Sequence, residues 1–401
     1  MNDVGEILRR KWSELKTSEL HEQNKVLSSS VRKINRNRVF RHLYYHPGQS
    51  KQEVSEALNM SLPTLSQNLS ELLERGLISN DETRESTGGR KARLLNVCGG
   101  AYFAVGLDVT AHHLSGVVIN FLGEIVYSEH IRIPFAAEEA YFLRMAQFIE
   151  DLLDGAKADR ARLLGVGLAV PAIVSRDGQQ LTYASILNFT HGRLSDFSRH
   201  IPYPCRFIND ADAGGFAEYW SNRALQDKSR DRGIVYLMVS NSVGGAFFLE
   251  GEGYAGRNQR ANEFGHITLH PDGERCYCGQ QGCADAYLNT KQLSDPYDGS
   301  LVTFFEALDG GDAAAAGLWE AYKRNLALLI NSLRMVYDCD IVLGGYIGSL
   351  IGRRIEEVRA LLAERNHFDS DGDYLVACMY RQEAAAVGAG LIYVNELLLS
   401  V

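Results

Sequence analysis

The chain is 401 residues long, which is too much for one ordinary hydrophobic core and indicates two or three domains. Its 45% apolar and 23% charged residues are typical of a globular protein, and no uninterrupted apolar run reaches about 18 residues, which argues against a membrane span. The net charge of −9 is uneven, because the first 96 residues hold 16 basic and 12 acidic side chains and the rest hold 25 and 38.

The N-terminal segment is charged from its first residues and lacks the apolar stretch of a secretory signal. We therefore expect a cytoplasmic protein that does not insert into membranes. Residues 25–43 contain six basic side chains and no acidic one. A basic head on an acidic body indicates that only the head approaches a polyanion, although a solvated helix face would give the same pattern in this segment.

Residues 50–78 predict two short helices that break at residues 59–61. Ser61 can cap the second helix, Pro63 is tolerated in its first turn, and Gly76 ends it. Both helices have apolar stripes at helical spacing, formed by Val54, Ala57 and Leu58 in the first and by Leu65, Leu69, Leu72 and Leu73 in the second. With the basic glycine turn "STGGRKARLL" behind them, these helices are typical of a winged helix-turn-helix.

The second of these helices would enter the major groove of DNA. Its outward amide and hydroxyl groups suit base edges and phosphates, and the basic wing can reach phosphates or the minor groove. The predicted DNA contacts are Thr64, Ser66, Gln67, Ser70, Arg90 and Lys91. A leucine stripe alone would also suit a protein–protein module, but the wing and the surrounding positive charge favour DNA.

The remaining sequence predicts an α/β body. Residues 102–133 indicate three successive strands, followed by a helix near 137–153 and the buried strand "LLGVGLAVP". Residues 233–254 repeat this opening, and helices are expected at 313–337, at 350–365 and at the C-terminus. Two similar openings predict two related lobes around a cleft. The expected domains are the DNA-binding head at 1–95, a first lobe at 96–220 completed by the helix at 381–401, and a second lobe at 221–380.

Three of the seven cysteines lie in "CYCGQQGC", at Cys276, Cys278 and Cys283. A tetrahedral zinc ion takes four nitrogen or sulfur ligands, and the glycines in this segment allow the backbone to fold tightly around an ion. His266 can supply the fourth ligand, with His270 as the local alternative. Four protein ligands leave no open position for water, so we expect a structural zinc ion. Three buried structural cysteines without a metal are the competing interpretation.

Together these segments resemble the ROK family, named for repressors, open reading frames and sugar kinases, from about Arg32 onward. "EFGHITLHPDGERCYCGQQGCADAY" is similar to the family signature, and "FINDADAGGFAE" is similar to its sugar-binding strand end. "VGLAVPAIVSRDG" resembles another strand and turn of the family, and "STGGRKARLL" resembles its repressor wing. The resemblance implies two actin-like, ribonuclease H-like lobes and assembly into a homodimer or homotetramer.

The resemblance also implies a monosaccharide site in the cleft. Carboxylates, an amide and an imidazole can accept from and donate to closely spaced hydroxyl groups. The implied sugar contacts are Asn209, Asp210, Glu263, His266 and Asp285, with Asn188 from a preceding loop. Asp285 stands where the family usually has Glu. Because the Asp side chain is one methylene shorter, we expect it to alter which sugar hydroxyl is contacted.

In the kinases of the family, the residue that matches Asp210 is the general base. Their glycine-rich phosphate loops are altered here, to "DVTAHH" from Asp108 and to "SNSVGGA" from Ser240, so we expect weak ATP binding and no enzymatic activity. The sequence therefore predicts a sugar-responsive DNA-binding regulator, a repressor of genes for carbohydrate metabolism or uptake, whose partners are operator DNA and a monosaccharide or its derivative. The alternatives are an ATP-dependent sugar kinase and a regulator controlled by a sugar-transport protein rather than by free sugar.

Overall fold

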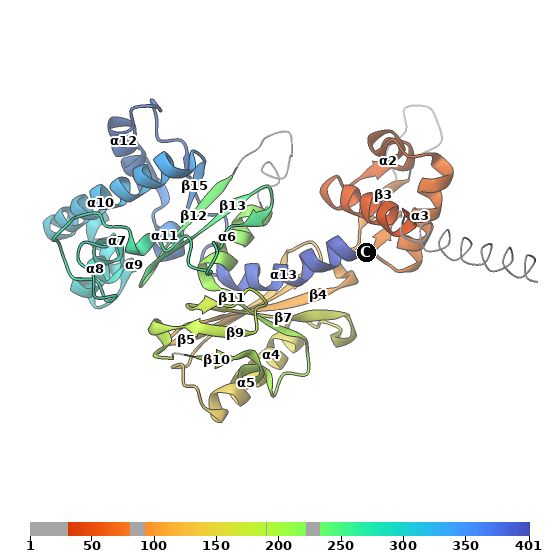
Figure 1. Cartoon of the computed structure of the whole chain (residues 1–401), viewed down its shortest axis with the longest axis horizontal. Helices are drawn as coiled ribbons and strands as arrows, with labels where there is room; N and C mark the ends of the chain where they lie inside the picture. The colour runs from red at the N-terminus through yellow and green to blue at the C-terminus, as the bar shows by residue number, and fades with distance from the viewer. Residues whose placement is uncertain (1–30, 81–92, 190, 222–232) are drawn as a thin grey trace, which may run out of the picture. The chain divides into compact units, whose positions relative to one another are not determined.

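The computed structural model describes residues 31–80, 93–189, 191–221 and 233–401, and the chain divides into two compact units (Figure 1). The first unit contains the described residues up to Ala101 together with Val394–Val401, and the second contains those from Tyr102 to Tyr393. Within the described ranges, every helix is too short or too polar to cross a membrane.

The first unit combines helices with a small sheet. A helix over residues 31–45 is followed by β1 (Gln49–Ser50), α2 (Lys51–Leu58), α3 (Leu62–Glu74), β2 (Ile78–Ser79), β3 (Leu94–Val97) and the 3-10 helix η1 (Gly99–Ala101). Strand β3 lies between β1 and β2 and is antiparallel to both. These elements form a winged helix-turn-helix, and the predicted wing falls between β2 and β3, outside the described residues. Arg90 and Lys91 lie outside the described residues.

Local capping chemistry explains where the two short helices begin and end. Ser50 and Glu53 form a capping box at the start of α2, and Asn59 ends this helix in the left-handed conformation with φ 48°. The Ser61 hydroxyl caps α3 by accepting from the backbone N–H of Thr64 at 3.4 Å. The predicted break at residues 59–61 is therefore confirmed.

The helix α3 buries most of the predicted stripe, since Leu65, Leu69 and Leu72 are at most 5% exposed and Leu73 is half-buried. The stripe predicted for α2 is wrong at Ala57, which is exposed. This two-turn helix buries only Val54, so the Ala57 methyl group, on a neighbouring part of the helix surface, stays in contact with solvent.

The end of the chain also belongs to the first unit. Leu398 and Val401 are buried, and Asn37 donates to the carbonyl oxygen of Leu398 at 2.8 Å. The Arg36 guanidinium donates to the carbonyl oxygen of Val401 at 3.2 Å and pairs with Glu71 of α3 at 2.7 Å. These bonds connect the last turn of α13 (Ala384–Ser400), through Arg36, to α3.

The second unit contains two five-stranded sheets. The first has the order β11-β7-β4-β5-β6, with β4 (Phe103–Val109), β5 (His113–Asn120), β6 (Ile125–Arg132), β7 (Leu163–Val170) and β11 (Cys205–Asn209). The second has the order β14-β13-β12-β15-β16, with β12 (Ile234–Val239), β13 (Val243–Leu249), β14 (Glu252–Gly253), β15 (Asp340–Gly344) and β16 (Leu375–Ala377).

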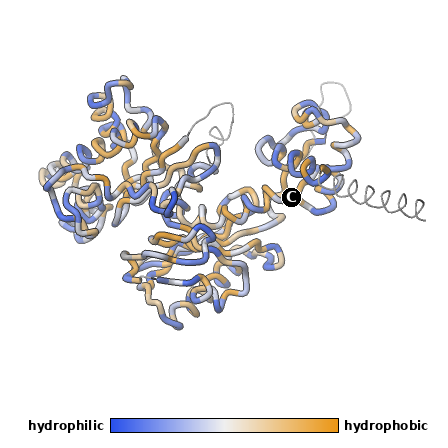
Figure 2. The backbone as a smooth tube through the Cα atoms, viewed as in Figure 1, coloured by the Kyte–Doolittle hydropathy of each residue, from blue (hydrophilic) through white to orange (hydrophobic). Residues whose placement is uncertain are grey.

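The two sheets have one topology. In each, the first three strands form an antiparallel meander, and two further strands add in parallel to the free side of the first. This arrangement confirms the prediction of two related α/β lobes from two similar strand-rich openings. Figure 2 shows that hydrophobic residues gather along the strands of both sheets.

Helices and short strands complete the two lobes. The first lobe has α4 (Glu139–Gly155), η2 (Arg160–Arg162), β8 (Ile173–Val174), β9 (Gln180–Tyr183), η3 (Ser185–Leu187), β10 (Gly192–Arg193) and α5 (Leu194–Ser198). The second has η4 (Phe264–His266), α7 (Ala284–Leu288), α8 (Lys291–Ser294), η5 (Asp295–Tyr297), α9 (Leu301–Asp309), α10 (Ala313–Tyr337), α11 (Gly345–Leu350), η6 (Gly352–Arg354) and α12 (Ile355–Arg365). Each lobe has its own apolar core.

Two helices hold the lobes together by close packing. Helix α6 (Asp210–Ser221) contacts β7 and β11 of the first sheet and β12 and β13 of the second. Helix α13 passes so near to β4 and α6 that a Cβ atom at Gly106 would overlap the carbonyl oxygen of Ala386, and one at Gly388 would overlap that of Ala213. These glycines are needed because two backbones meet without room for a side chain.

Candidate functional site

A cavity of about 480 Å³ lies between the two lobes of the second unit. The first lobe lines it with the segment after β7, the end of β11 and the first turn of α6, and the second lobe lines it with the start of β13, the loop before η4 and Tyr277. This volume is in the range of small-molecule sites, which lie mostly between about 300 and 1,000 Å³.

Four of the predicted sugar contacts line this cavity, namely Asn209, Asp210, Glu263 and His266. They come from the end of β11, the start of α6 and the η4 segment. The Asn209 amide is fixed by its own bonds, since it donates to the carbonyl oxygen of Ala172 at 3.1 Å and accepts from the N–H of Asp212 at 3.0 Å. The parallel strand end and the following helix thus present adjacent amide and carboxylate groups to the cavity.

The other two predicted contacts are placed differently. Asp285 is buried and is not among the cavity-lining residues, and one of its carboxylate oxygens accepts from the backbone N–H of Val243 at 2.7 Å. Asn188 is exposed in the left-handed conformation with φ 51° and also does not line the cavity. Their roles as sugar contacts stay predictions.

Several acidic side chains lie in or beside the cavity, and burial raises their pKa values. The pKa of Asp108 is raised to about 7 by burial and by the charge of Asp210. Burial raises the pKa of Asp210 to about 6, and burial with repulsion from Asp210 and Glu263 raises that of Asp212 to about 7. Burial also raises the pKa of Glu263, against the opposing effect of His266. The pKa values of the three aspartates are therefore about 6 to 7, well above that of an exposed carboxyl group.

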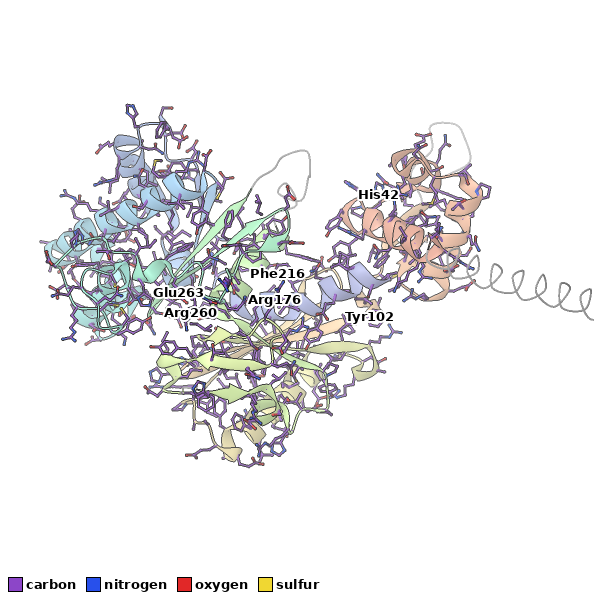
Figure 3. The ribbon with its side chains drawn as sticks, viewed as in Figure 1. His42, Tyr102, Arg176, Phe216, Arg260 and Glu263 are labelled. Carbon is purple, nitrogen blue, oxygen red and sulfur yellow. The ribbon has the colours of Figure 1, made fainter. Side chains whose placement is uncertain are left out.

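Sequence reasoning missed several groups that line the same cavity. Arg176, Arg260, Asp212 and Tyr277 all lie there, and three of them are within three residues of a predicted contact or metal ligand. Arg176 belongs to the turn after β8, and its place in the quoted "VGLAVPAIVSRDG" was the signal that could have pointed to it. Arg176, Arg260 and Glu263 are labelled in Figure 3.

The four predicted metal ligands form one cluster. One ligand atom from each of His266, Cys276, Cys278 and Cys283 can be chosen so that all four lie within 4.8 Å of one another. The Sγ atoms of Cys278 and Cys283 are 3.8 Å apart, and Cys276 Sγ is 3.8 Å from His266 Nδ1. A tetrahedron with zinc–sulfur bonds of about 2.3 Å has edges of about 3.8 Å, so the cluster fits such an ion.

The surroundings of the cluster decide between the two histidines. His270 Nε2 hydrogen-bonds Asn325 Oδ1 at 2.7 Å and is not part of the cluster. The knuckle itself depends on glycine, because Gly282 has φ 79° and a Cβ atom there would overlap the carbonyl oxygen of His270. The His266 ring turns Nδ1 to the thiols and Nε2 to the Tyr277 hydroxyl, 3.3 Å away. One imidazole thus belongs both to the cluster that could hold a metal ion and to the lining of the cavity.

The predicted DNA-contacting residues of α3 lie on its open side. Gln67 and Ser70 are exposed, and Thr64 and Ser66 are half-buried. The Ser66 hydroxyl donates to the carbonyl oxygen of Leu62 at 2.5 Å, and the Thr64 hydroxyl hydrogen-bonds that of Ser61 at 2.9 Å. Gln67 and Ser70 are therefore the better placed of the four for contact with bases.

Side chains hydrogen-bond several backbone N–H groups around the two segments that the sequence predicted to be altered phosphate loops. The Thr110 hydroxyl accepts from the N–H of His113 at 3.0 Å, and the Ser240 hydroxyl accepts from that of Tyr346 at 3.3 Å. The N–H of Val243 is taken by Asp285. A phosphate group would have to compete with these bonds for the same donors.

Comparison with known proteins agrees with this architecture. Residues 104–396 match the family model described as "ROK family", and residues 32–79 match "Winged helix-turn-helix DNA-binding". The sequence is 23% identical to the putative xylose repressor of Caldicellulosiruptor sp. (strain Rt8B.4), over 92% of this chain and 97% of that protein. It is also 23% identical to the DNA-binding transcriptional dual regulator NagC of Escherichia coli (strain K12), over 79% and 81%.

Solved structures share the fold. A ROK family transcriptional regulator described as a homologue of the E. coli MLC protein has a TM-score of 0.72 at 20% identity, over 92% of this chain and 98% of the other. A ROK family glucokinase from Streptomyces griseus, in complex with glucose and AMPPNP, has a TM-score of 0.59 at 21% identity, over 72% and 98%. The regulator matches the chain over more of its length than the kinase does.

Proposed function

Because this chain belongs to the ROK family and begins with a winged helix-turn-helix, we propose that it is a sugar-responsive transcriptional repressor. The head, residues 1–95, binds operator DNA, and the two lobes at 96–220 with 381–401 and at 221–380 bind a monosaccharide or its derivative. The regulated genes serve carbohydrate uptake or metabolism. The names of relatives that match most of this chain support this proposal. A cytoplasmic location is part of the proposal.

One observation carries the proposal: a single cavity gathers Asn209, Asp210, Glu263 and His266 in a chain that also has a DNA-binding fold. Amide, carboxylate and imidazole groups fixed around a cavity of this size suit a ligand with several adjacent hydroxyl groups. We propose that Asp285 and Asn188 also contact the sugar, after a rearrangement that brings their side chains to the cavity.

The cysteine cluster is proposed to hold a structural zinc ion on His266, Cys276, Cys278 and Cys283. Zinc with four protein ligands supplies no reactive position and fixes a loop. What this chain gains is the orientation of the His266 ring, whose Nε2 hydrogen-bonds the hydroxyl group of Tyr277, another residue that lines the cavity. Loss of the metal would therefore loosen the ligand site before it affects the head.

Operator DNA is proposed to be bound by a homodimer or homotetramer, because two heads related by symmetry read two half-sites. A sugar that prefers one arrangement of the lobes shifts the population that can bind DNA. The predicted contacts to DNA are Thr64, Ser66, Gln67 and Ser70 of α3 together with the wing residues outside the described ranges.

A kinase is the second candidate, because Asp210 is retained and lies in the cavity. The hydrogen bonds that occupy the N–H groups of His113, Val243 and Tyr346 count against a phosphate cradle here. Release of ADP in the presence of ATP and a sugar, abolished by Asp210→Asn, would establish the kinase instead.

The deciding experiment measures DNA binding with and without sugars. Genomic fragments selected on the purified protein serve as operators, and a panel of monosaccharides and derivatives is first screened by thermal shift, since a ligand of the native state raises the melting temperature. We expect a sugar that raises the melting temperature to weaken operator binding at least ten-fold. If no sugar in a broad panel changes DNA binding, the proposal fails, and release by a sugar-transport protein becomes the alternative to test.

A further inference from the structure

Tyr277 hydrogen-bonds the nitrogen of His266 that does not face the cysteine cluster. The Nδ1 atom of this imidazole lies 3.8 Å from Cys276 Sγ, and the Tyr277 hydroxyl hydrogen-bonds Nε2 at 3.3 Å. The two rings meet edge to face, with their centroids 5.4 Å apart. Both residues line the cavity, so this bond joins two groups of its wall.

An imidazole nitrogen makes one hydrogen bond, because it carries either one proton or one lone pair in the plane of the ring. A sugar hydroxyl and the Tyr277 hydroxyl therefore compete for His266 Nε2. Asn209 makes one bond with its amide nitrogen and one with its amide oxygen, and each atom can make a second. Asp210 accepts from the N–H of Ala211 at 3.0 Å, and its carboxylate can accept further bonds. Of these three predicted sugar contacts, His266 is the one that must give up its partner to bind a hydroxyl.

The Tyr277 side chain can leave His266 without disturbing the cysteine cluster. It is 57% exposed, so its hydroxyl can exchange the imidazole for water. The backbone around it is fixed by the turn of the knuckle. There the N–H of Cys276 donates to the carbonyl oxygen of Gln280 at 2.8 Å, and the N–H of Gly279 donates to that of Cys276 at 2.9 Å. A rotation about the Cα–Cβ bond of Tyr277 therefore leaves the thiols in place.

We propose that Tyr277 is a positioning residue that sets the affinity for the sugar, because its hydroxyl occupies His266 Nε2 in the empty cavity and gives way to a sugar hydroxyl. This inference rests on the proposed function. The sugar must break the bond between the two side chains before it can use His266, so part of its binding free energy is lost in the exchange. The presence of Tyr277 thereby raises the sugar concentration at which the protein responds.

Calorimetric titration of the wild type and of Tyr277→Phe tests the proposal. The variant keeps the ring and removes only the competing hydroxyl. The probes are D-xylose, D-glucose, N-acetyl-D-glucosamine and any further monosaccharide that raises the melting temperature. Every sugar that binds should bind the variant about three- to ten-fold more tightly, which is the size of effect expected for one neutral hydrogen bond.

The titration separates failure of the inference from failure of the proposed function. Equal or weaker binding by Tyr277→Phe would overturn the inference and leave the proposed function standing, because a sugar would still bind. If no sugar binds either protein, the proposed function and the inference both fail.

Tyr287→Phe is the matched control. The Tyr287 hydroxyl accepts from the N–H of Glu274 at 2.6 Å, so it holds the segment just before the cysteine cluster, but Tyr287 does not line the cavity. We expect no gain in sugar affinity from this variant. A gain equal to that of Tyr277→Phe would overturn the inference, because a looser knuckle rather than the release of His266 would then explain the higher affinity.

Nitrogen NMR of protein with labelled histidines adds a readout that a merely structural role would not move. In the sugar-free protein, Tyr277→Phe should shift the Nε2 signal of His266, which is assigned by its loss in His266→Gln. Saturation with a sugar should bring the wild type and Tyr277→Phe to the same Nε2 shift, because the sugar hydroxyl is then the partner in both. A difference that persists at saturation, or no difference without sugar, would contradict the exchange of partners.

Discussion

Replacing Asp212 by Asn should make the body of the protein more stable, and more so at high pH. Asp212 lies in the first turn of α6 beside the cavity, and burial together with Asp210 and Glu263 raises its pKa to about 7. Since the folded-state pKa lies above that of the unfolded chain, the native state holds the proton more tightly. The contribution of Asp212 to the free energy of unfolding is therefore most favourable below about pH 4, and it is lost as the pH rises through about 7.

The size of the effect follows from the pKa difference. At about 1.4 kcal/mol per pKa unit, a rise in the pKa of Asp212 from 3.8 to about 7 means that the ionised side chain at pH 8 destabilises the folded state by about 4 kcal/mol. The side chain faces a cavity that water can enter, so we expect about half of this, about 2 kcal/mol. Loss of a negative charge at the N-terminus of α6 costs about 0.5 kcal/mol and does not reverse the sign.

Calorimetric melting of the full chain at pH 5 and pH 8 measures this effect. For a body of this size, about 2 kcal/mol corresponds to a rise of about 4 °C in Tm at pH 8, with less than half of that at pH 5. Asp373→Asn, which changes an exposed carboxylate, is the matched control and should leave Tm unchanged at both pH values. A variant no more stable than the wild type at pH 8, or a gain independent of pH, would refute the reasoning.

Three further changes test the metal site, the packing and the head. Cys283→Ser should lower bound zinc from about one equivalent to less than half by elemental analysis, while Cys205→Ser, outside the cluster, should leave it unchanged. Gly388→Ala should lower the free energy of unfolding, measured by urea denaturation, by about 1–3 kcal/mol, because the new Cβ atom overlaps a carbonyl oxygen of α6. Gly317→Ala, which adds a methyl group in open space on a helix, is the control and should raise this free energy by up to about 1 kcal/mol. Gln67→Ala should weaken operator binding about ten-fold in a fluorescence titration and leave sugar-induced thermal shifts intact; unchanged DNA affinity would contradict the proposed readout.

Features specified by neighbouring residues were predicted well. The break between α2 and α3 depends on Ser61 and on residues within one turn of it. The cysteine cluster was predictable because three of its members lie within eight residues, so a tight turn brings their thiols together. The Ala57 prediction failed because helical spacing gives the direction of a side chain but not how far the neighbouring element extends to cover it.

The sequence alone determined the helix-turn-helix head, the strand-rich openings of the two lobes and the cysteine cluster, because short-range spacing and periodicity decide these features. Tertiary structure decided which residues share the cavity: Asn209 and Glu263 are 54 positions apart, yet both line it. It also decided that the Asp285 carboxylate accepts from the N–H of Val243 and that burial raises the pKa values of Asp108, Asp210 and Asp212. Burial and charge repulsion depend on what surrounds a group in space, and no pattern along the chain contains that information.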